Sequence, residues 1–323
     1  MINSDRSFFK NAPRFLLGAF LLFGLFSLPV LGQEAPEPVA PADAPEAEAK
    51  ELRFMAYNLE NYLTMTRYVK GGEKVETSKD PKEIEALVKI IVAEKPDILG
   101  ICEIGTEADL KDLQTRLKNA GLDLPHSVHA GGSDTTRHLG LLSTLPIAAN
   151  NSQKELVYQI SGHERMVSRG ILSVTIDLPG GSTHFVGLHL KSKRELKEFD
   201  QAEIRLHEAR LAREHCEAIM EKDPEARIVL YGDMNDTRKT PPLSMLMGRF
   251  KSKTYLGDVF AKDSRGHLWT HYWSYQQQYS RFDWVLVSPS VYPDVDQEKS
   301  YIVDPDNWNE ASDHRAILMT LKK

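Results

Sequence analysis

Six short polar clusters in this chain stand directly at the ends of apolar runs. They are YNLEN, CEIG, GLHLKS, YGDMND, SRFDWVLVS and SDHRAI, and they contribute Asn58, Glu103, His189, Lys191, Asp233, Asn235, Asp283, Asp313 and His314. Each cluster joins a carboxylate, a carboxamide or an imidazole to a predicted strand, where an uncompensated buried charge is costly. One such cluster is ordinary, but six indicate that the strand ends converge on one site.

These residue types suit the hydrolysis of a phosphate ester. Carboxylate and amide oxygens are the ligands that Mg²⁺ prefers, and such a cation neutralises phosphoryl charge and stabilises the leaving oxygen. An imidazole or a carboxylate can activate the attacking water, and carboxamide or imidazole donors can bind phosphoryl oxygens. The sequence contains neither the nucleophile motif G-x-S-x-G nor the phosphate-binding motif G-x-x-x-x-G-K-[ST].

With these clusters in this order, the sequence resembles the endonuclease/exonuclease/phosphatase superfamily. That superfamily includes pancreatic-type deoxyribonucleases, abasic-site endonucleases, inositol-polyphosphate 5-phosphatases and neutral sphingomyelinases. The resemblance runs from about Arg53 to the C-terminus, and GDMND together with the closing SDH is its most specific part. It implies a four-layer α/β sandwich, in which two mixed β-sheets pack face to face with helices outside and the site lies at one end.

The resemblance also implies a metal site. Glu103 is the implied principal ligand, with Asn58 and Asp313 close to the metal. The implied cofactor is Mg²⁺, for which Mn²⁺ or Ca²⁺ are substitutes. The number of metal ions, one or two, stays open.

The catalytic roles that the resemblance implies fall on five residues. His314 is the implied catalytic imidazole, oriented by Asp283. Asp233 and Asn235 are expected to align or deprotonate the water and to bind the scissile phosphate. His189 is expected to bind a phosphoryl oxygen or to assist the leaving group. Which of these groups is the general base stays open.

Other polar and aromatic residues have weaker claims to the site. Lys191 has the best claim to phosphate, because it follows His189 by two residues, and Arg137, His138, Arg165 and Arg169 have lesser ones. The remaining histidines, His126, His129, His163 and His271, belong to no motif, so we expect them on the surface or in packing. The aromatic residues Trp269, Tyr272 and Trp273 could stack on a base or a lipid, or simply pack a hairpin.

Two segments precede the predicted catalytic domain, residues 51–323. Residues 1–32 contain a basic start and the uncharged run FLLGAFLLFGLFSLPVLG, which predicts a secretory signal peptide; the alternative is a membrane anchor. Residues 33–50 are rich in Ala, Pro and Glu and predict a disordered linker. We therefore expect a secreted or periplasmic protein, which is membrane-bound only if the first segment is uncleaved.

Charge and cysteine content narrow the function classes. The net charge is −6; residues 1–32 contribute +2 and residues 33–50 contribute −4, which leaves −4 for residues 51–323. An acidic domain has no broad basic surface for sequence-blind nucleic-acid binding, although a local basic patch stays open.

The two cysteines, Cys102 and Cys216, lie in apolar surroundings and are expected to be buried free thiols.

The intervening elements are predicted from capping and periodicity. Asp80 and Thr106 are expected to cap two helices, the second ending at Gly121, and residues 200–224 read as a long helix. Its predicted inward face consists of Ala202, Leu206, Ala209, Ala212, Cys216 and Ile219. Short apolar runs bounded by Gly or Pro predict the strands.

The sequence thus predicts an exported, metal-dependent phosphodiesterase, with endonuclease activity as one form. The alternatives are a lipid or sugar-phosphate phosphoesterase and a catalytically idle binding protein. The expected partner is the phosphate-ester substrate, nucleic acid included, and no dedicated protein partner is evident.

Overall fold

The structure, a computed structural model, describes residues 51–68 and 72–322. The predicted signal peptide (1–32) and linker (33–50) lie outside the described residues. All of the described residues belong to one compact unit. No helix in this described part is long and apolar enough to cross a membrane.

Two mixed six-stranded sheets form the framework. The first has the order β17 (Val295–Ile302), β18 (Ile317–Leu321), β1 (Leu52–Tyr62), β4 (Ile98–Ile104), β6 (His138–Ser143) and β5 (His126–Ala130). The second has the order β13 (Gly257–Asp258), β16 (Asp283–Val287), β12 (Arg227–Asp233), β11 (Gly181–His189), β10 (Leu172–Leu178) and β7 (Ile147–Asn150). One neighbouring pair in each sheet is parallel: β1 with β4, and β11 with β12.

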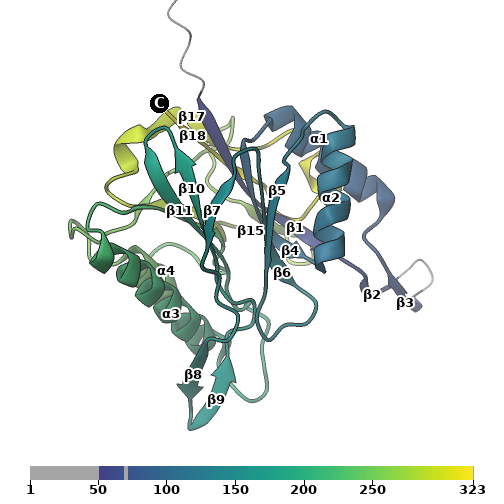
Figure 1. The fold of residues 1–323 in the computed structure, drawn as a ribbon. Coiled ribbons are helices and arrows are strands. Elements are labelled where there is room, and N and C mark those ends of the chain that lie inside the picture. The colour runs from purple at the N-terminus through teal and green to yellow at the C-terminus, as the bar shows by residue number, and fades with distance from the viewer. Residues whose placement is uncertain (1–50, 69–71, 323) are drawn as a thin grey trace, which may run out of the picture. The chain divides into compact units, whose positions relative to one another are not determined.

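Three layers of apolar side chains fill the sandwich: one lies between the two sheets, and one lies between each sheet and its helices. Side chains alternate along a strand, so Phe54 and Ala56 of β1 face the second sheet, whereas Met55 and Tyr57 face the helices. Helices α1 (Pro81–Glu94) and α2 (Glu107–Asn119) cover the first sheet, and α3 (Gln201–Lys222) and α4 (Pro241–Met247) cover the second (Figure 1). The predicted four-layer sandwich is confirmed.

The predicted helix starts are also confirmed. The Asp80 carboxylate accepts a hydrogen bond from Lys82 N, and Thr106 forms a capping box with Asp109. Both thiols are free and buried, as expected.

The predicted inward face of α3 is only partly right. Ala209, Ala212 and Cys216 are buried, but Ala202 is exposed. Arg205 and Glu208 are buried in the same helix instead. Arg205 pairs with Asp236 at 3.1 Å, and Glu208 accepts from the backbone of Ser168 and Lys191. Such partners offset the cost of burial, and apolar periodicity does not reveal them.

Three two-stranded hairpins lie outside the large sheets. They are β2 (Met65–Tyr68) with β3 (Lys74–Thr77), β8 (Val157–Ile160) with β9 (His163–Met166), and β14 (His271–Trp273) with β15 (Gln278–Ser280). In the β14–β15 hairpin, His271 forms an isolated β-bridge with His314, which lies near the C-terminus.

Candidate active site

Strand register brings the predicted residues to one end of the sandwich. In the second sheet, His189 stands opposite Asp233, and Asp233 stands opposite Asp283. In the first sheet, Asn58 of β1 stands opposite Cys102, which precedes Glu103. The segment before β18 supplies Asp313 and His314.

These residues surround a cavity of about 390 Å³. Seven of the nine predicted residues line it, namely Glu103, His189, Lys191, Asp233, Asn235, Asp313 and His314. The other two, Asn58 and Asp283, are buried and bond to residues that line it. The convergence predicted from six separate clusters is therefore present.

Unusual backbone conformations occur where the strands end. Gly232 has φ +128, and a Cβ there would lie 1.9 Å from Leu188 O, so only glycine fits directly before Asp233. Glu103 and Asn235 have φ values of +63 and +48. A positive φ in a non-glycine residue is costly and is concentrated at functional sites.

His314 is fixed by a carboxylate behind it. Its Nδ1 lies 2.7 Å from Asp283 Oδ2, and its Nε2 lies 3.8 Å from Asp233 Oδ2. Burial alone would lower the pKa of His314, but the charges of Asp283 and Asp233 outweigh it and raise that pKa well above its usual value. The second nitrogen, Nε2, lies 3.5 Å from Asn58 Nδ2 at the cavity wall, in the orientation expected of a catalytic acid or base.

Asp233 lies at the centre of a buried polar network. It accepts from Asn58 Nδ2 and Asn235 Nδ2, both at 3.1 Å, and from Asn235 N at 2.8 Å. Burial raises its pKa to about 7; the charge of His314 opposes this rise and the charge of Asp283 adds to it. The network holds the carboxylate in one orientation.

The opposite wall carries carboxylates that suit a hard cation. Glu103 accepts from Asn61 N at 2.9 Å, and its Oε1 lies 3.7 Å from His189 Nε2. Glu60, which the sequence reading did not select, accepts from Asp313 N at 2.9 Å. Burial and the charge of Asp313 raise the pKa of Glu60 to about 7, despite Lys79. Carboxylate oxygens gathered in this way fit a divalent cation such as Mg²⁺.

Asn58 does not line the cavity, and its predicted place close to the metal stays a prediction. Its Oδ1 accepts from Glu60 N at 3.0 Å, and its Nδ2 donates to Asp233. The side chain is 1% exposed and does not line the cavity. In this structure Asn58 orients Asp233 and the turn that carries Glu60, and Glu103 and Asp313 face the cavity.

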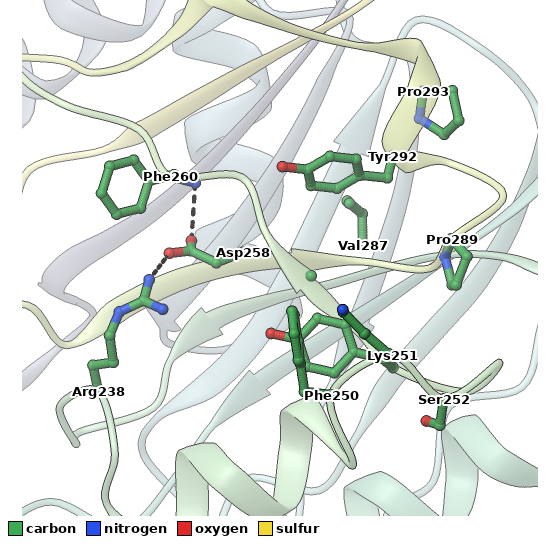
Figure 2. Close-up of a pocket in the computed structure, with 12 residues that line it drawn as sticks. Arg238, Phe250, Lys251, Ser252, Asp258, Phe260, Val287, Pro289, Tyr292 and Pro293 are labelled. Carbon is green, nitrogen blue, oxygen red and sulfur yellow. Dashed lines mark hydrogen bonds and ion pairs between the residues drawn. The ribbon is translucent and has the colours of Figure 1, made fainter. Parts of the chain in front are cut away.

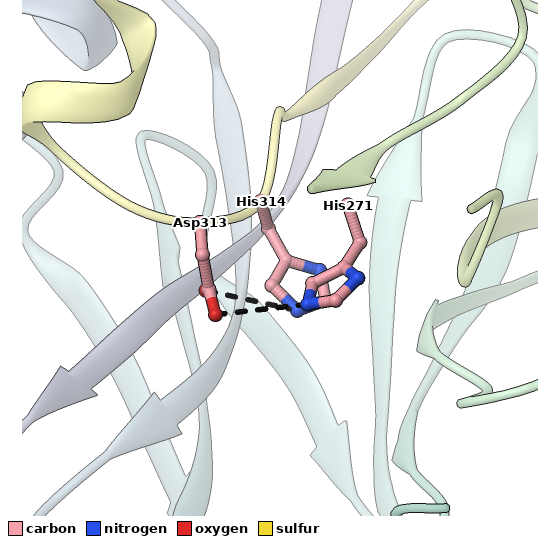
Figure 3. Close-up of side chains that lie close together, drawn as sticks. All are labelled: His271, Asp313 and His314. Carbon is pink, nitrogen blue, oxygen red and sulfur yellow. Dashed lines mark ion pairs between the residues drawn. The ribbon is translucent and has the colours of Figure 1, made fainter. Parts of the chain in front are cut away.

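The sequence predicts His271 only on the surface or in packing, and not as part of the site. His271 lines the cavity, and its Nε2 lies 3.7 Å from Asp313 Oδ2 (Figure 3). Donor atoms of His271, Asp313 and His314 all lie within 4.8 Å of one another. However, Nδ1 of His314 is already bonded to Asp283, and a hard cation such as Mg²⁺ prefers oxygen ligands. The carboxylate set therefore fits a cation better.

Basic residues form the remaining wall of the cavity. Lys191, Arg137, Arg169 and Arg194 all line it. Arg165 does not, because its guanidinium lies over the ring of Phe199. Burial, together with the charges of Arg169 and His314, lowers the pKa of His189 well below its usual value, so this imidazole is neutral. The cavity thus offers carboxylates for a cation and basic side chains for an anion.

A larger groove lies elsewhere and contains none of the predicted residues. Its volume is about 660 Å³, and it follows β13 at the edge of the second sheet (Figure 2). Phe250, Tyr255, Phe260 and Tyr292 line it. It offers apolar surface but not the clustered carboxylates and imidazoles that ester hydrolysis requires.

Arg315 anchors the segment that carries His314. Its Nη1 donates to Asp263 Oδ2 at 2.9 Å, its guanidinium stacks on Trp269 with Cζ 3.3 Å from the ring centroid, and its backbone N donates to Thr270 O. Both members of the Arg315–Asp263 pair are 2% exposed. This anchor fixes the position of the neighbouring catalytic residues.

We expect Asp263→Asn to lower the free energy of unfolding by about 3–5 kcal/mol, because removing one partner leaves a buried charge. Burial alone would raise the pKa of Asp263, but hydrogen bonds from Arg315 and from the backbone of His267 lower it to about 2. The unfolded value is about 3.9, so this contribution is full above about pH 4 and lost as the pH falls towards 2. Urea unfolding at pH 7 and pH 3 measures both effects.

The matched control is Asp123→Asn. Asp123 pairs with Lys118 at 2.9 Å, but both side chains are exposed. We expect a change of at most about 1 kcal/mol there. Equal unfolding midpoints for the two variants would show that the buried pair does not anchor the segment.

Comparisons with known proteins agree with this geometry. A sequence model described as the endonuclease/exonuclease/phosphatase family matches residues 58–309. No curated protein matches the chain.

Several solved structures share the fold of this chain. The truncated TDP2 of Caenorhabditis elegans has 15% identity and a TM-score of 0.55, and the match covers 85% of this chain and 99% of that one. A family protein from Leptotrichia buccalis has 14% identity and a TM-score of 0.57, over 84% and 100% of the chains. Sphingomyelinase C from Streptomyces griseocarneus has 13% identity and a TM-score of 0.54, over 84% and 100%.

Proposed function

This chain belongs to the endonuclease/exonuclease/phosphatase family, and from that premise we propose that it is a metal-dependent phosphodiesterase. Members of the family are hydrolases that act on phosphodiester and other ester bonds. The observation that carries the proposal is the pairing of His314 with Asp283 beside a cavity that is also lined by Asp233, Glu103 and Asp313.

The proposed mechanism uses a water molecule as the nucleophile. Nδ1 of His314 bonds to Asp283, so protons are exchanged at Nε2. Asp233 lies 3.8 Å from that nitrogen, so the two groups can align the water and take up its proton. The pH dependence of the reaction would show whether His314 or Asp233 acts as the base.

Phosphate contacts are proposed for His189 and Lys191, and Asn235 is proposed to hold Asp233 in place. The amide of Asn235 donates to Leu190 O and to Asp233, which fixes its orientation at the cavity wall. His189 is neutral, so it can donate a hydrogen bond to a phosphoryl oxygen without competing for the cation. Lys191 supplies positive charge on the same wall.

Glu103 and Asp313 are the proposed metal ligands, with Glu60 next to them. Bound Mg²⁺ would neutralise phosphoryl charge and stabilise the leaving oxygen. Arg137 Nε lies 3.9 Å from Glu103 Oε2, so the carboxylate is positioned from the side opposite His189. Mn²⁺ or Ca²⁺ are proposed substitutes with the same preference for oxygen ligands.

The substrate panel that tests this function contains bis-p-nitrophenyl phosphate, plasmid DNA, sphingomyelin vesicles and inositol phosphates. We expect the protein to hydrolyse bis-p-nitrophenyl phosphate with Mg²⁺, to lose this activity in excess EDTA, and to recover it when Mg²⁺ is restored. Activity that persists in EDTA would contradict the metal dependence. Tight Mg²⁺ binding without turnover of any ester would favour a binding protein.

One observation favours a second candidate, a lipid phosphodiesterase. The β14–β15 hairpin next to the site carries Trp273, Tyr275 and Tyr279, and these are exposed by 46%, 85% and 57%. Exposed aromatic residues suit a membrane interface. If sphingomyelin alone is hydrolysed, this candidate is correct and the nuclease form of the proposal is not.

Export is proposed from the sequence of residues 1–32 alone. The basic start and the long uncharged run are typical of a signal peptide. Fractionation of expressing cells, with N-terminal sequencing of the mature protein, tests it. An intact N-terminus in the membrane fraction would instead support the anchor.

A further inference from the structure

Arg169 is a buried cation whose side chain is only partly paired. The residue is 8% exposed and lines the same cavity as His189 and Asp233. Its Nη2 lies 3.3 Å from Asp134 Oδ2. Its Nε and Nη1 are buried and have no hydrogen-bond partner among the described residues. Buried polar groups in proteins are normally bonded, so the guanidinium of Arg169 is an incompletely satisfied cation at the wall of the cavity.

The direction of Arg169 is set by rigid backbone contacts. Asp134 N donates to Ser168 O at 2.7 Å, and Ser168 N donates to the buried Glu208. A Cβ on Gly132 would lie 2.4 Å from Val167 O, so the two loops touch only because that residue is glycine. The guanidinium is therefore positioned by the fold, as a binding residue needs to be.

Further cations line the cavity together with Arg169. They are Arg137, Lys191 and Arg194. Burial and the neighbouring charge of Arg169 lower the pKa of Lys191. The nearby acids are already engaged: Glu208 accepts from the backbone of Ser168 and Lys191, and Asp134 accepts from Thr136. The side chains of these two acids are thus fixed by other partners, and Asp134 contacts only Nη2 of Arg169.

We propose that Arg169, with Lys191 and Arg137, forms a second anion subsite that binds a phosphate of the substrate other than the one being cleaved. The inference rests on the proposed function and names its substrate class: an ester whose scissile phosphate has a second phosphate nearby. Guanidinium groups bind phosphate with charge-assisted hydrogen bonds. Successive phosphates of a polynucleotide and a phosphorylated sugar share this chemistry.

The subsite also disfavours one substrate class. A choline phosphodiester has a single phosphate and a permanent positive charge next to it. A choline group bound next to Arg169 and Lys191 would be repelled by their like charge. We therefore expect sphingomyelin to be a poorer substrate than an ester with two phosphates.

The probe pair is thymidine 5′-(p-nitrophenyl phosphate) with and without a 3′-phosphate, hydrolysed by the full chain with Mg²⁺. The two compounds have the same scissile ester. For the wild type we expect kcat/KM to be about 10- to 100-fold higher with the 3′-phosphate, the range of one or two charge-assisted bonds. In Arg169→Gln we expect the ratio to fall to about 1.

The matched control is Arg165→Gln. Arg165 lies four residues away, also has a buried Nε without a partner among the described residues, and does not line the cavity. Its ratio should equal that of the wild type. A calorimetric titration with thymidine 3′,5′-bisphosphate in EDTA gives a second readout, in which Arg169→Gln should bind about 10-fold more weakly. Competition by inositol 1,4-bisphosphate then distinguishes a sugar source of the second phosphate from a nucleotide source.

The outcomes separate the two proposals. If neither ester releases p-nitrophenol, the proposed function is overturned. If the wild type cleaves both esters with a ratio near 1, the proposed function stands and the subsite is overturned. The wild-type ratio decides this even if Arg169→Gln does not fold, and an equal ratio in wild type and a folded Arg169→Gln also overturns the subsite.

Discussion

His314→Gln is expected to lower kcat on a phosphodiester by about 10²–10⁴-fold, the usual contribution of a positioned acid or base. The physical reason is the geometry around the ring: Asp283 holds Nδ1 at 2.7 Å, and Nε2 faces Asp233 and the cavity. Glutamine keeps hydrogen-bonding capacity but cannot exchange a proton. Steady-state kinetics on bis-p-nitrophenyl phosphate at saturating Mg²⁺ measure the loss.

The control for this prediction is His184→Gln. His184 lies in the same strand as His189, bonds to Thr175 Oγ1 at 3.0 Å, and does not line the cavity. We expect its kcat to stay within about twofold of wild type, since surface changes away from a site are usually mild. A His314→Gln enzyme as active as the control would remove His314 from the mechanism.

Glu103→Gln is expected to raise the Mg²⁺ concentration for half-maximal activity by more than about 10–100-fold, because even the loss of a residue behind a metal ligand has that effect. Its carboxylate lies between Asn61 N and His189 on the cation-binding wall. The amide preserves the shape of the side chain but removes its charge. A titration of activity with Mg²⁺, together with direct calorimetry, provides the measurement.

Glu107→Gln serves as the control for the metal. Glu107 is in the first turn of α2, four residues after Glu103, and its side chain is exposed. Its Mg²⁺ dependence should match that of wild type. A Glu103→Gln enzyme with an unchanged Mg²⁺ dependence would place the cation elsewhere.

The fold and most of the site could be predicted because their determinants are local. A polar residue directly after an apolar strand must lie at the end of a sheet, so Glu103, His189 and Asp233 were found from their immediate neighbours. Asp80 and Thr106 were found as helix caps for the same reason. Periodicity then distinguished strands from helices.

The residues that were missed depend on contacts between distant segments. His271 lies in the site because it forms a β-bridge with His314, 43 residues later, and no local sequence pattern predicts that pairing. Arg169 was not missed but had only a weak claim from the sequence, because the contact of two loops around Gly132 places it. Glu60 stands two residues after Asn58 in YNLEN, and its contact with Asp313 is equally remote in sequence. The i, i+2 spacing on one strand was the single available signal for Glu60.

The most direct test compares the wild type with the double variant Glu103→Gln/His314→Gln in one assay of p-nitrophenol release from bis-p-nitrophenyl phosphate. The proposed site predicts release by the wild type that requires Mg²⁺ and stops in EDTA, and no release above background by a double variant with a native circular dichroism spectrum. Equal rates for the two proteins, or a wild type that releases nothing with Mg²⁺, would contradict it.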